Sequence, residues 1–349
     1  MAHDPADAAA PIPAATDAET VHAWLGSLIP GVLLCAVIAT AALLLRHFSG
    51  FTALSPMIVS IALGALLHNA LGTPLAAKPG VAFSLRWILR FAIVLLGFQL
   101  TTQQVLDVGA TGFAVIAISL IACFVVTRPL GAALGVDAKL TELIAAGTSI
   151  CGASAVIAAN TVTKAPEEDC AYAVACVTLC GMVAMVVYPL LPLLLGLSAR
   201  DYGLWTGASV HEVAQVVAAS YQAGKEAGDY ATITKLTRVI MLAPMMMVLG
   251  AMATRRANGG GELRRAPLPY FALGFIAAIA ANSTIDIAPD AKDTIIDATT
   301  FLLALSLAAM GLATDFKKLA PKGARPLVLG ALSTVFIAVL SLLLVKLVA

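Results

Sequence analysis

Long apolar runs alternate with short polar connections along most of this chain. A helix needs about 20 mostly apolar residues to cross a bilayer, or slightly fewer where flanking side chains reach the interface. The segments that meet this requirement are centred near Val37, Ile61, Ile93, Ile116, Ala153, Met185, Ala214, Pro244, Ile276, Ala304 and Ile337. The pattern predicts an all-α polytopic membrane protein of about 11 transmembrane helices. We expect one transmembrane domain over residues 28–349, after a polar tail over residues 1–27.

Two of these segments contain small and polar residues where a spanning helix would lie deepest. They read GTSICGASAVIAAN at residues 147–160 and GASVHEVAQVVAAS at residues 207–220. Glycine costs about 1 kcal/mol relative to alanine inside a helix, and serine competes for backbone hydrogen bonds. The sequence therefore predicts two interrupted helices, either broken or re-entrant. The alternative is that the small residues only let neighbouring helices pack closely.

An interrupted helix in a membrane predicts a binding site. Non-helical backbone survives at that depth only where it is buried in protein or lines a cavity. Half-helix N-termini also carry unpaired N–H groups and partial positive charge, which attract anions. We therefore expect Ser149, Cys151, Gly152 and Ser154 to present side chains and backbone N–H groups to a solute, together with Ser209, the match of Ser149.

The two interrupted stretches also resemble each other. The matched residues are Gly147 with Gly207, Ser149 with Ser209, Val156 with Val216, and the pair Ala158-Ala159 with Ala218-Ala219. The two segments are two spans apart, so simple helices there would cross the membrane in the same direction. Either one segment is re-entrant or the likeness is partly compositional.

A second internal likeness joins the two ends of the chain. Pro56 and Asn69 have the same spacing as Pro269 and Asn282, and the interval from Gly97 to Gly109 equals that from Gly311 to Gly323. Repeat-like halves therefore cover residues 55–127 and 268–348 and flank a central segment, residues 140–255. The shift is an odd number of spans, so the second half is expected to be inverted, as in many secondary transporters.

Composition agrees with membrane insertion. The chain is 60% hydrophobic and only 12% charged, whereas a soluble domain has about 25% charged residues. The net charge of +1 and the lack of a basic arm argue against binding of nucleic acid. No signal peptide is expected, because residues 1–27 hold no Lys or Arg. The six cysteines lie in or beside apolar runs, so we expect no disulfide, metal or cofactor.

Basic residues in the connections indicate the orientation. They are more numerous in the connections that are cytoplasmic if the N-terminus is inside, for example in RRANGGGELRRAP, which begins at Arg255. We expect a bacterial inner-membrane protein with a cytoplasmic N-terminus and an external C-terminus. The expected partners are the lipid bilayer and a small anionic solute; whether the chain forms a homodimer stays open.

Ionisable groups inside the spans indicate function, because each costs roughly 2.5 to 3.5 kcal/mol on insertion scales. Lys235 and Arg238 are three residues apart and share one helix face. Facing half-helix N-termini, they would suit a divalent oxyanion; alternatively, they reach the outer interface. Arg90 lies deep enough in its span to line the pathway.

His211 and Glu212 lie beside the second interruption. Either side chain could carry a coupling proton. The alternatives are that Glu212 neutralises Lys235 or Arg238, or that the pair contacts the solute. Further along, Glu167, Glu168 and Asp169 suit the first turn of a helix and are expected to form a solvated cap.

Several stretches resemble one family. GTSICGASA with the following EED, the run LLGFQL, and GASVHEVAQVVAA are similar to the YeiH-like bacterial membrane proteins, generally labelled sulfate exporters. The resemblance begins near Leu28 and continues to the end. It implies an inner-membrane transporter related in architecture to inverted-repeat secondary carriers with crossed, broken helices. The chain departs from the pattern at Gln99, where a basic residue is often expected.

The leading interpretation is a secondary transporter that exports a small anion, such as sulfate or a related oxyanion or sulfonate, by alternating access with proton coupling left open. A cation/proton exchanger would need paired carboxylates at the interruption, and residues 147–160 contain none. An anion channel remains an alternative. An enzyme is not expected, because a zinc site of the HExxH type needs a second histidine where this chain has Gln215.

Overall fold

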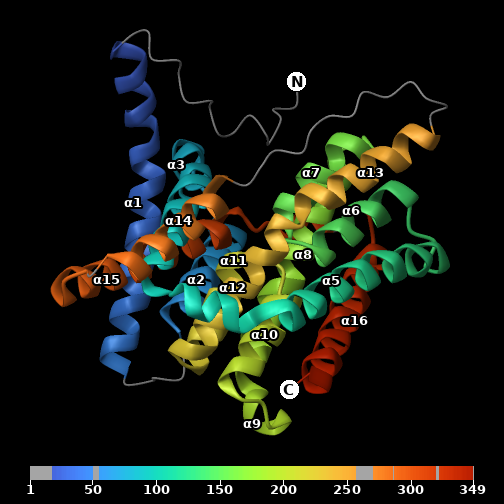
Figure 1. The fold of residues 1–349 in the computed structure, drawn as a ribbon. Coiled ribbons are helices and arrows are strands. Elements are labelled where there is room, and N and C mark those ends of the chain that lie inside the picture. Colours follow the sequence, from blue (N-terminus) through green and yellow to red (C-terminus); the bar gives the residue numbers. More distant parts are fainter. Residues whose placement is uncertain (1–17, 50–54, 257–269, 286, 320–321, 349) are drawn as a thin grey trace. The chain divides into compact units, whose positions relative to one another are not determined.

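A computed structural model describes residues 18–49, 55–256, 270–285, 287–319 and 322–348. The described part is helical and contains no strand, which confirms the expected all-α class. The α-helices are α1 (Ala18–Ser49), α2 (Pro56–Leu71), α3 (Lys78–Phe83), α4 (Leu89–Leu96), α5 (Thr102–Ala133), α6 (Ala138–Ser149), α7 (Ala153–Thr163), α8 (Glu167–Val187), α9 (Pro192–Leu195), α10 (Ala199–Ser209), α11 (Val213–Ser220), α12 (Lys225–Ile240), α13 (Leu242–Arg256), α14 (Tyr270–Thr284), α15 (Pro289–Ala313) and α16 (Ala324–Val348) (Figure 1).

Within the described residues, 7 helices are long and apolar enough to cross a membrane. They are Trp24–Phe48, Leu75–Gln99, Thr102–Ala133, Glu167–Leu190, Lys225–Ala251, Pro289–Ala313 and Ala324–Val348. Large apolar side chains project outward along α1 and α16, at Ile29, Leu33 and Val37 and at Val335 and Val339. Such stripes suit contact with lipid and would be costly in water, so the chain is a membrane-embedded helical protein.

Two expected segments lie partly outside this description. Helix α1 begins at Ala18, within the stretch expected to be a polar tail, and residues 1–17 lie outside the described residues. Most of the predicted loop from Arg255 does so too, because residues 257–269 are not described.

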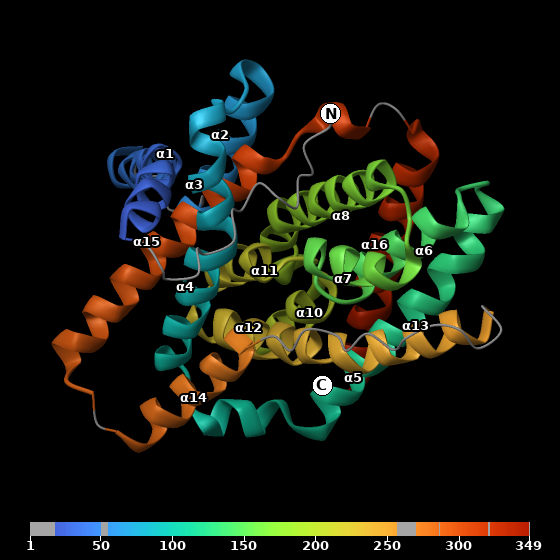
Figure 2. The same cartoon turned by 90° about the horizontal axis from the view of Figure 1, so that it is seen from above.

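The helices form two compact units. Unit 1 comprises Met1–Leu100 and Gly274–Asp315, and unit 2 comprises Thr101–Leu273 and Phe316–Ala349. Unit 1 therefore holds the helices from α1 to α4, most of α14, and α15. Unit 2 holds the helices from α5 to α13, and α16, and it contains both interrupted segments (Figures 1 and 2).

Unit 1 contains a reciprocal pair of contacts. The Asn69 side chain of α2 donates to the Thr314 carbonyl beyond the end of α15 at 2.8 Å. The Asn282 side chain of α14 donates to the Leu100 carbonyl, beyond the end of α4, at 2.7 Å. The two asparagines are matched in the sequence, and Leu100 follows Gly97 by the same three positions that separate Thr314 from Gly311. The matched segments of unit 1 thus use the same interaction twice.

In unit 2, α6 and α7 fold back on each other as a helical hairpin, called hairpin 1 here. Lys139, in the first turn of α6, donates to the carbonyl of Lys164, which follows the last residue of α7, at 2.9 Å. Thr163 donates to the Glu142 carboxylate at 2.8 Å. The two arms therefore share one base, and the tip is the interruption between Ser149 and Ala153.

Helices α10 and α11 form a second hairpin, called hairpin 2. The Tyr202 hydroxyl, near the start of α10, donates to the Ala219 carbonyl near the end of α11 at 3.2 Å. Its tip is the interruption between Ser209 and Val213. Both interrupted segments are thus hairpins, so neither is a single crossing, and the expected number of spans is reduced at these two places.

The hairpins approach from opposite ends of α5. Hairpin 1 follows the C-terminal end of α5 after a short connection at residues 134–137. At the base of hairpin 2, Arg200 donates to the Asp107 carbonyl, near the N-terminal end of α5, at 2.7 Å. In Figure 1, α6 and α7 lie above α5 and α10 lies below it. The two hairpins thus lie beside different parts of α5, which is kinked at Gly109 (φ 56°, ψ −166°).

Candidate functional site

The tip of hairpin 1 is a three-residue interruption. Ile150 ends α6 with φ −118° and ψ −85°, and Gly152 precedes α7 with φ 66° and ψ −132°. The positive φ of Gly152 is a conformation that other residues adopt at a cost. A side chain at this position would also collide with the Glu212 carboxylate. Glycine is therefore required at position 152 by backbone conformation and by space.

The tip of hairpin 2 is extended. Val210 has ψ 146° and Glu212 also has ψ 146°, so α11 restarts at Val213. The Glu212 N–H donates to the Gln215 side-chain oxygen at 3.1 Å, and Gln215 donates onward to the Thr178 carbonyl of α8 at 3.1 Å. Gln215, the residue that rules out an HExxH motif, thus stabilises this tip.

One ammonium group joins the two tips. Lys235 of α12 has no exposed surface, and its Nζ donates to the Ile150 carbonyl at 2.7 Å and to the Val210 carbonyl at 2.9 Å. Ile150 and Val210 occupy equivalent positions in the two matched stretches. Lys235 therefore holds both interruptions together, and the two segments meet at one centre.

Arg238 lies one turn further along α12 and is also fully buried. Its Nε donates to the Ser149 carbonyl at 2.7 Å, its Nη1 to the Val210 carbonyl at 3.3 Å, and its Nη2 to the Thr148 carbonyl. The partners of both cations differ from the expected ones. The positive charges face the C-terminal, partly negative ends of α6 and α10, because those carbonyls have no partner within their helices.

Glu212 occupies the opposite kind of helix end. One carboxylate oxygen accepts the Ala153 N–H, at the first turn of α7, at 2.8 Å. The side chain is buried, with the residue 9% exposed. Its hydrogen-bond partner is thus a half-helix N-terminus rather than Lys235 or Arg238. An internal carboxylate therefore lies where a bound anion was expected.

His211 and Ser209 are buried beside this centre. The His211 Nε2 lies 3.3 Å from the Thr334 hydroxyl of α16, and His211 Nδ1 has no partner among the described residues. Ser209 donates to the Trp205 carbonyl at 2.6 Å and accepts from the Tyr188 hydroxyl at 3.0 Å. Ser209 is therefore already engaged by the protein, whereas His211 has one free nitrogen.

The remaining candidates of hairpin 1 differ in exposure. Ser149 and Cys151 are buried, and the Ser149 hydroxyl has no partner in the described part of the chain. Ser154, in the first turn of α7, is exposed. Ser154 is thus the exposed candidate residue of this tip.

Arg90 lies in unit 1, on α4, and is exposed. Its guanidinium lies 5.7 Å from the centre of the Trp87 ring. Trp87 belongs to a short π-helical stretch, Ser84–Ile88, inside the span Leu75–Gln99. Such stretches are frequent at functional sites, so the expected role of Arg90 in the pathway remains a prediction about unit 1.

The arrangement favours one sign of charge. In membrane proteins with broken helices, carbonyl groups at half-helix C-termini can coordinate cations; here Lys235 and Arg238 already bind them. The half-helix N-terminus of α7 holds only a carboxylate on a short side chain. The carbonyl ends are therefore paired with cations of the protein, and the N-terminus of α7 is paired with a carboxylate.

Comparison with known proteins places the chain among bacterial membrane proteins. The family described as Conserved hypothetical protein 698 matches residues 30–330. A UPF0324 membrane protein of Pseudomonas aeruginosa is 40% identical over 326 residues, which is 89% of this chain and 91% of that protein. The UPF0324 inner membrane protein YeiH of Escherichia coli K12 is 36% identical over 319 residues, 88% of this chain and 90% of that protein. No solved structure matches the chain.

Proposed function

Because this chain belongs to the UPF0324 family of membrane proteins, we propose that it is a secondary transporter of a small anion. The solute binds at the tips of the two hairpins and reaches them by alternating access. The observation that carries the proposal is the pairing at the centre, where Lys235 and Arg238 cap the carbonyl ends and leave the N-terminus of α7 for negative charge. The bacterial inner membrane is its proposed location.

The sequence repeats support alternating access. Hairpin 1 with α8 and hairpin 2 with α12 are related by a constant shift of sixty positions, and their hairpins approach from opposite ends of α5. In unit 1 the matched Asn69 and Asn282 make reciprocal contacts. Two inverted copies give a fold two arrangements of similar energy, one open to each side of the membrane.

Glu212 is the proposed link between anion and proton. Its carboxylate and a solute anion would compete for the Ala153 N–H, because both seek the positive end of the α7 dipole. Protonation removes the charge of Glu212 and releases this position. His211, with its free Nδ1, lies next in the chain and is the proposed second proton carrier. Ser154 then offers its hydroxyl to the solute.

Transport into proteoliposomes tests the proposal. The purified chain should take up one or more of sulfate, sulfite, thiosulfate, sulfonates or carboxylates in a saturable manner that depends on a counter-ion or a proton gradient. Saturation and counter-ion dependence distinguish a carrier from a channel. Uptake of Na⁺ or K⁺ in exchange for protons, with no anion transported, would overturn the proposal in favour of a cation/proton exchanger.

The variant Glu212→Gln tests the proton link. The amide keeps an oxygen near the Ala153 N–H but cannot titrate, so anion transport should lose most of its dependence on the proton gradient. The rate of proton-independent anion exchange should change less than about tenfold. Glu168→Gln is the matched control, because that carboxylate is 82% exposed. An unaltered proton dependence in the Glu212 variant would remove this residue from the coupling step.

A further inference from the structure

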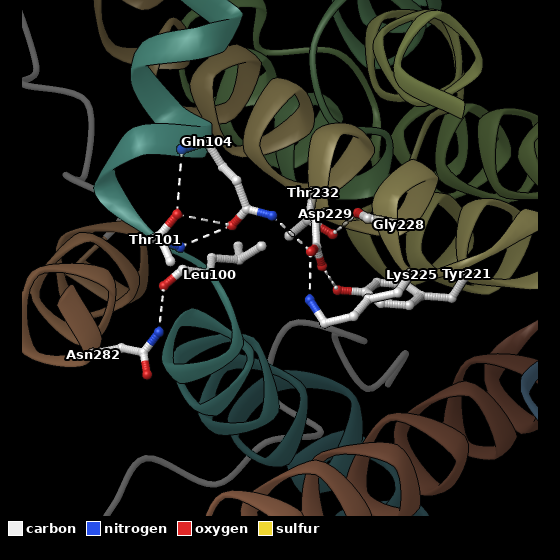
Figure 3. Close-up of polar contacts among 9 residues, drawn as sticks. All are labelled: Leu100, Thr101, Gln104, Tyr221, Lys225, Gly228, Asp229, Thr232 and Asn282. Carbon is white, nitrogen blue, oxygen red and sulfur yellow. Dashed lines mark hydrogen bonds and ion pairs between the residues drawn. The ribbon is translucent and has the colours of Figure 1, made fainter. Parts of the chain in front are cut away.

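A second group of polar side chains lies at the base of hairpin 2. Asp229, in α12, has a side chain that is 2% exposed. It accepts hydrogen bonds from Tyr221 at 2.9 Å and Gln104 at 2.9 Å, and its Oδ2 lies 2.5 Å from the Lys225 ammonium (Figure 3). Tyr221 follows the last residue of α11, and Gln104 is in the first turn of α5. This Asp229 cluster thus joins hairpin 2, α12 and the start of α5.

The position of Gln104 is fixed from its other side. The Gln104 side-chain oxygen accepts the Thr101 N–H at 2.9 Å, which leaves the Nε2 group directed at Asp229 (Figure 3). A helix-capping interaction at the start of α5 therefore sets the geometry of the donor. The carboxylate is held by three donors from three segments, which indicates a specific tie rather than a solvated surface group.

Asp169 is the counterpart of Asp229. It lies sixty positions earlier, the same shift that relates the two hairpin tips, and it is in the first turn of α8. Contrary to the expectation of a solvated cap, Asp169 is buried at 4% exposure, and its Oδ1 lies 2.7 Å from the Lys322 ammonium. The neighbouring Tyr172 donates to the Gly323 carbonyl at 3.0 Å. Asp169 raises the pKa of Lys322, which lies outside the spans.

Asp229 and Asp169 bind segments that are themselves matched in the sequence. Asp229 binds the start of α5, and Asp169 binds the segment just before α16. The sequence matches Gly109 of α5 with Gly323 before α16, and both have positive φ, 56° and 71°. Each carboxylate therefore connects the helix after one hairpin to a residue that precedes a matched glycine, Gln104 before Gly109 and Lys322 before Gly323.

We propose that Asp169 and Asp229 are paired gate residues. Asp229 binds Tyr221 at the end of hairpin 2. Lys322, the partner of Asp169, also feels the charge of Asp137, which caps the start of hairpin 1. Each tie thus fixes the base of one hairpin, and release of one tie admits solute to the tips from that side only. The inference rests on the proposed transport function for its purpose, but the ties themselves are local. They position the hairpins and do not contact the solute.

Hydrogen–deuterium exchange of the full-length protein in nanodiscs tests this assignment. Asp229→Asn should raise the exchange rate of residues 213–224 by about tenfold, because a buried charged hydrogen bond is lost. Residues 153–166 should be unchanged. Asp169→Asn should do the reverse. Equal increases in both hairpins would indicate a general loss of stability and would overturn the proposal. No increase in either hairpin would overturn it as well.

Two further variants keep the test decisive at hairpin 2 if Asp229→Asn folds poorly. Tyr221→Phe removes only one hydroxyl from the Asp229 cluster and should raise exchange in residues 213–224 by a smaller factor. Asp201→Asn is the matched control at the base of hairpin 2, because Asp201 pairs with the exposed Ser198 and not with α12. An increase at residues 213–224 in the control that equals that of Asp229→Asn would also overturn the proposal. Exchange is measured without transport, so a failure of the anion assay leaves this result interpretable.

Discussion

At the scale of the residue, the centre of unit 2 is defined by complementary ends of helices. Lys235 and Arg238 bind carbonyl groups that α6 and α10 leave unpaired, and Glu212 binds an N–H group of α7. Inside a membrane each such group would cost several kcal/mol if left without a partner. The same residues that could bind a solute therefore also make the interruptions stable.

Replacement of Lys235 should show this double role. Lys235→Met removes the two bonds that join the tips, and interhelical hydrogen bonds in membranes contribute about 1–2 kcal/mol in model peptides. We expect a lower midpoint of thermal unfolding in detergent together with loss of anion transport. Lys346→Met is the control, since Lys346 binds one carbonyl at the exposed end of α16. Equal midpoints for the two variants would contradict the role given to Lys235.

Gly152 is the second residue whose replacement is informative. Gly152→Ala places a methyl group against the Glu212 carboxylate at a backbone conformation with φ 66°. Such strain alone costs of order 1–3 kcal/mol. Gly109→Ala is the matched control, because Gly109 has a similar backbone conformation, with φ 56° and ψ −166°, and free space around it. Transport should fall further in the Gly152 variant than in the control; equal losses would mean that contact with Glu212 is unimportant.

At the scale of the element, the interruptions were predictable and their direction was not. Clusters of glycine and serine marked both tips, which the structure places at Ile150–Gly152 and Val210–Glu212. An apolar run of spanning length can equally be one crossing or two short arms, because hydropathy records length and not direction. The arms here are 12 and 11 residues in hairpin 1, too short for either to span alone.

The Asp229 cluster was missed for a related reason. Asp229 lies in a mixed polar segment that gives no local signal of burial, and its partner Gln104 is 125 positions away in the sequence. The signal that could have found it is the shift of sixty positions, which pairs it with Asp169. A repeat identified at the hairpin tips should therefore be extended through the following helix.

The contacts of Asn69 and Asn282 in unit 1 predict that the two matched segments contribute equally to stability. Asn69→Ala and Asn282→Ala each leave one carbonyl beyond a helix end without its donor. If the segments are equivalent, the two variants should lower the free energy of unfolding by similar amounts, about 1 kcal/mol each. Thermal unfolding of the single variants and of the double variant measures this. A large effect of one and none of the other would argue against equivalence.

At the scale of the whole molecule, the hairpins change the side of the membrane on which particular residues of unit 2 are expected. Lys164 lies at the base of hairpin 1 with Lys139, and Arg200 lies at the base of hairpin 2 beside the start of α5. A chain of simple crossings would place Lys164 outside and Arg200 in the cytoplasm. With both segments folded as hairpins, and with the N-terminus inside as the excess of basic residues predicts, we expect Lys164 to be cytoplasmic and Arg200 external.

Labelling of intact cells measures this difference. Arg200→Cys should react with a membrane-impermeant maleimide added outside, and Lys164→Cys should react only after the membrane is opened. The unsubstituted protein gives the background of the native cysteines, five of which are buried. The opposite labelling pattern would show either simple crossings or an inverted orientation, and a tag at the N-terminus would distinguish these two outcomes.

The shared ammonium of Lys235 has a consequence for leakage. Because one group is bonded to a carbonyl of each tip, withdrawal of either hairpin leaves Lys235 with only the other tip as a partner. Withdrawal of both would strand a bare charge in the bilayer interior, at a cost that grows with the absence of water. A conformation in which both hairpin tips have moved away from Lys235 is therefore disfavoured by the charge of this single side chain. In the proposed transporter, only one hairpin would then open at a time. No continuous pathway would form through which ions could leak across the membrane.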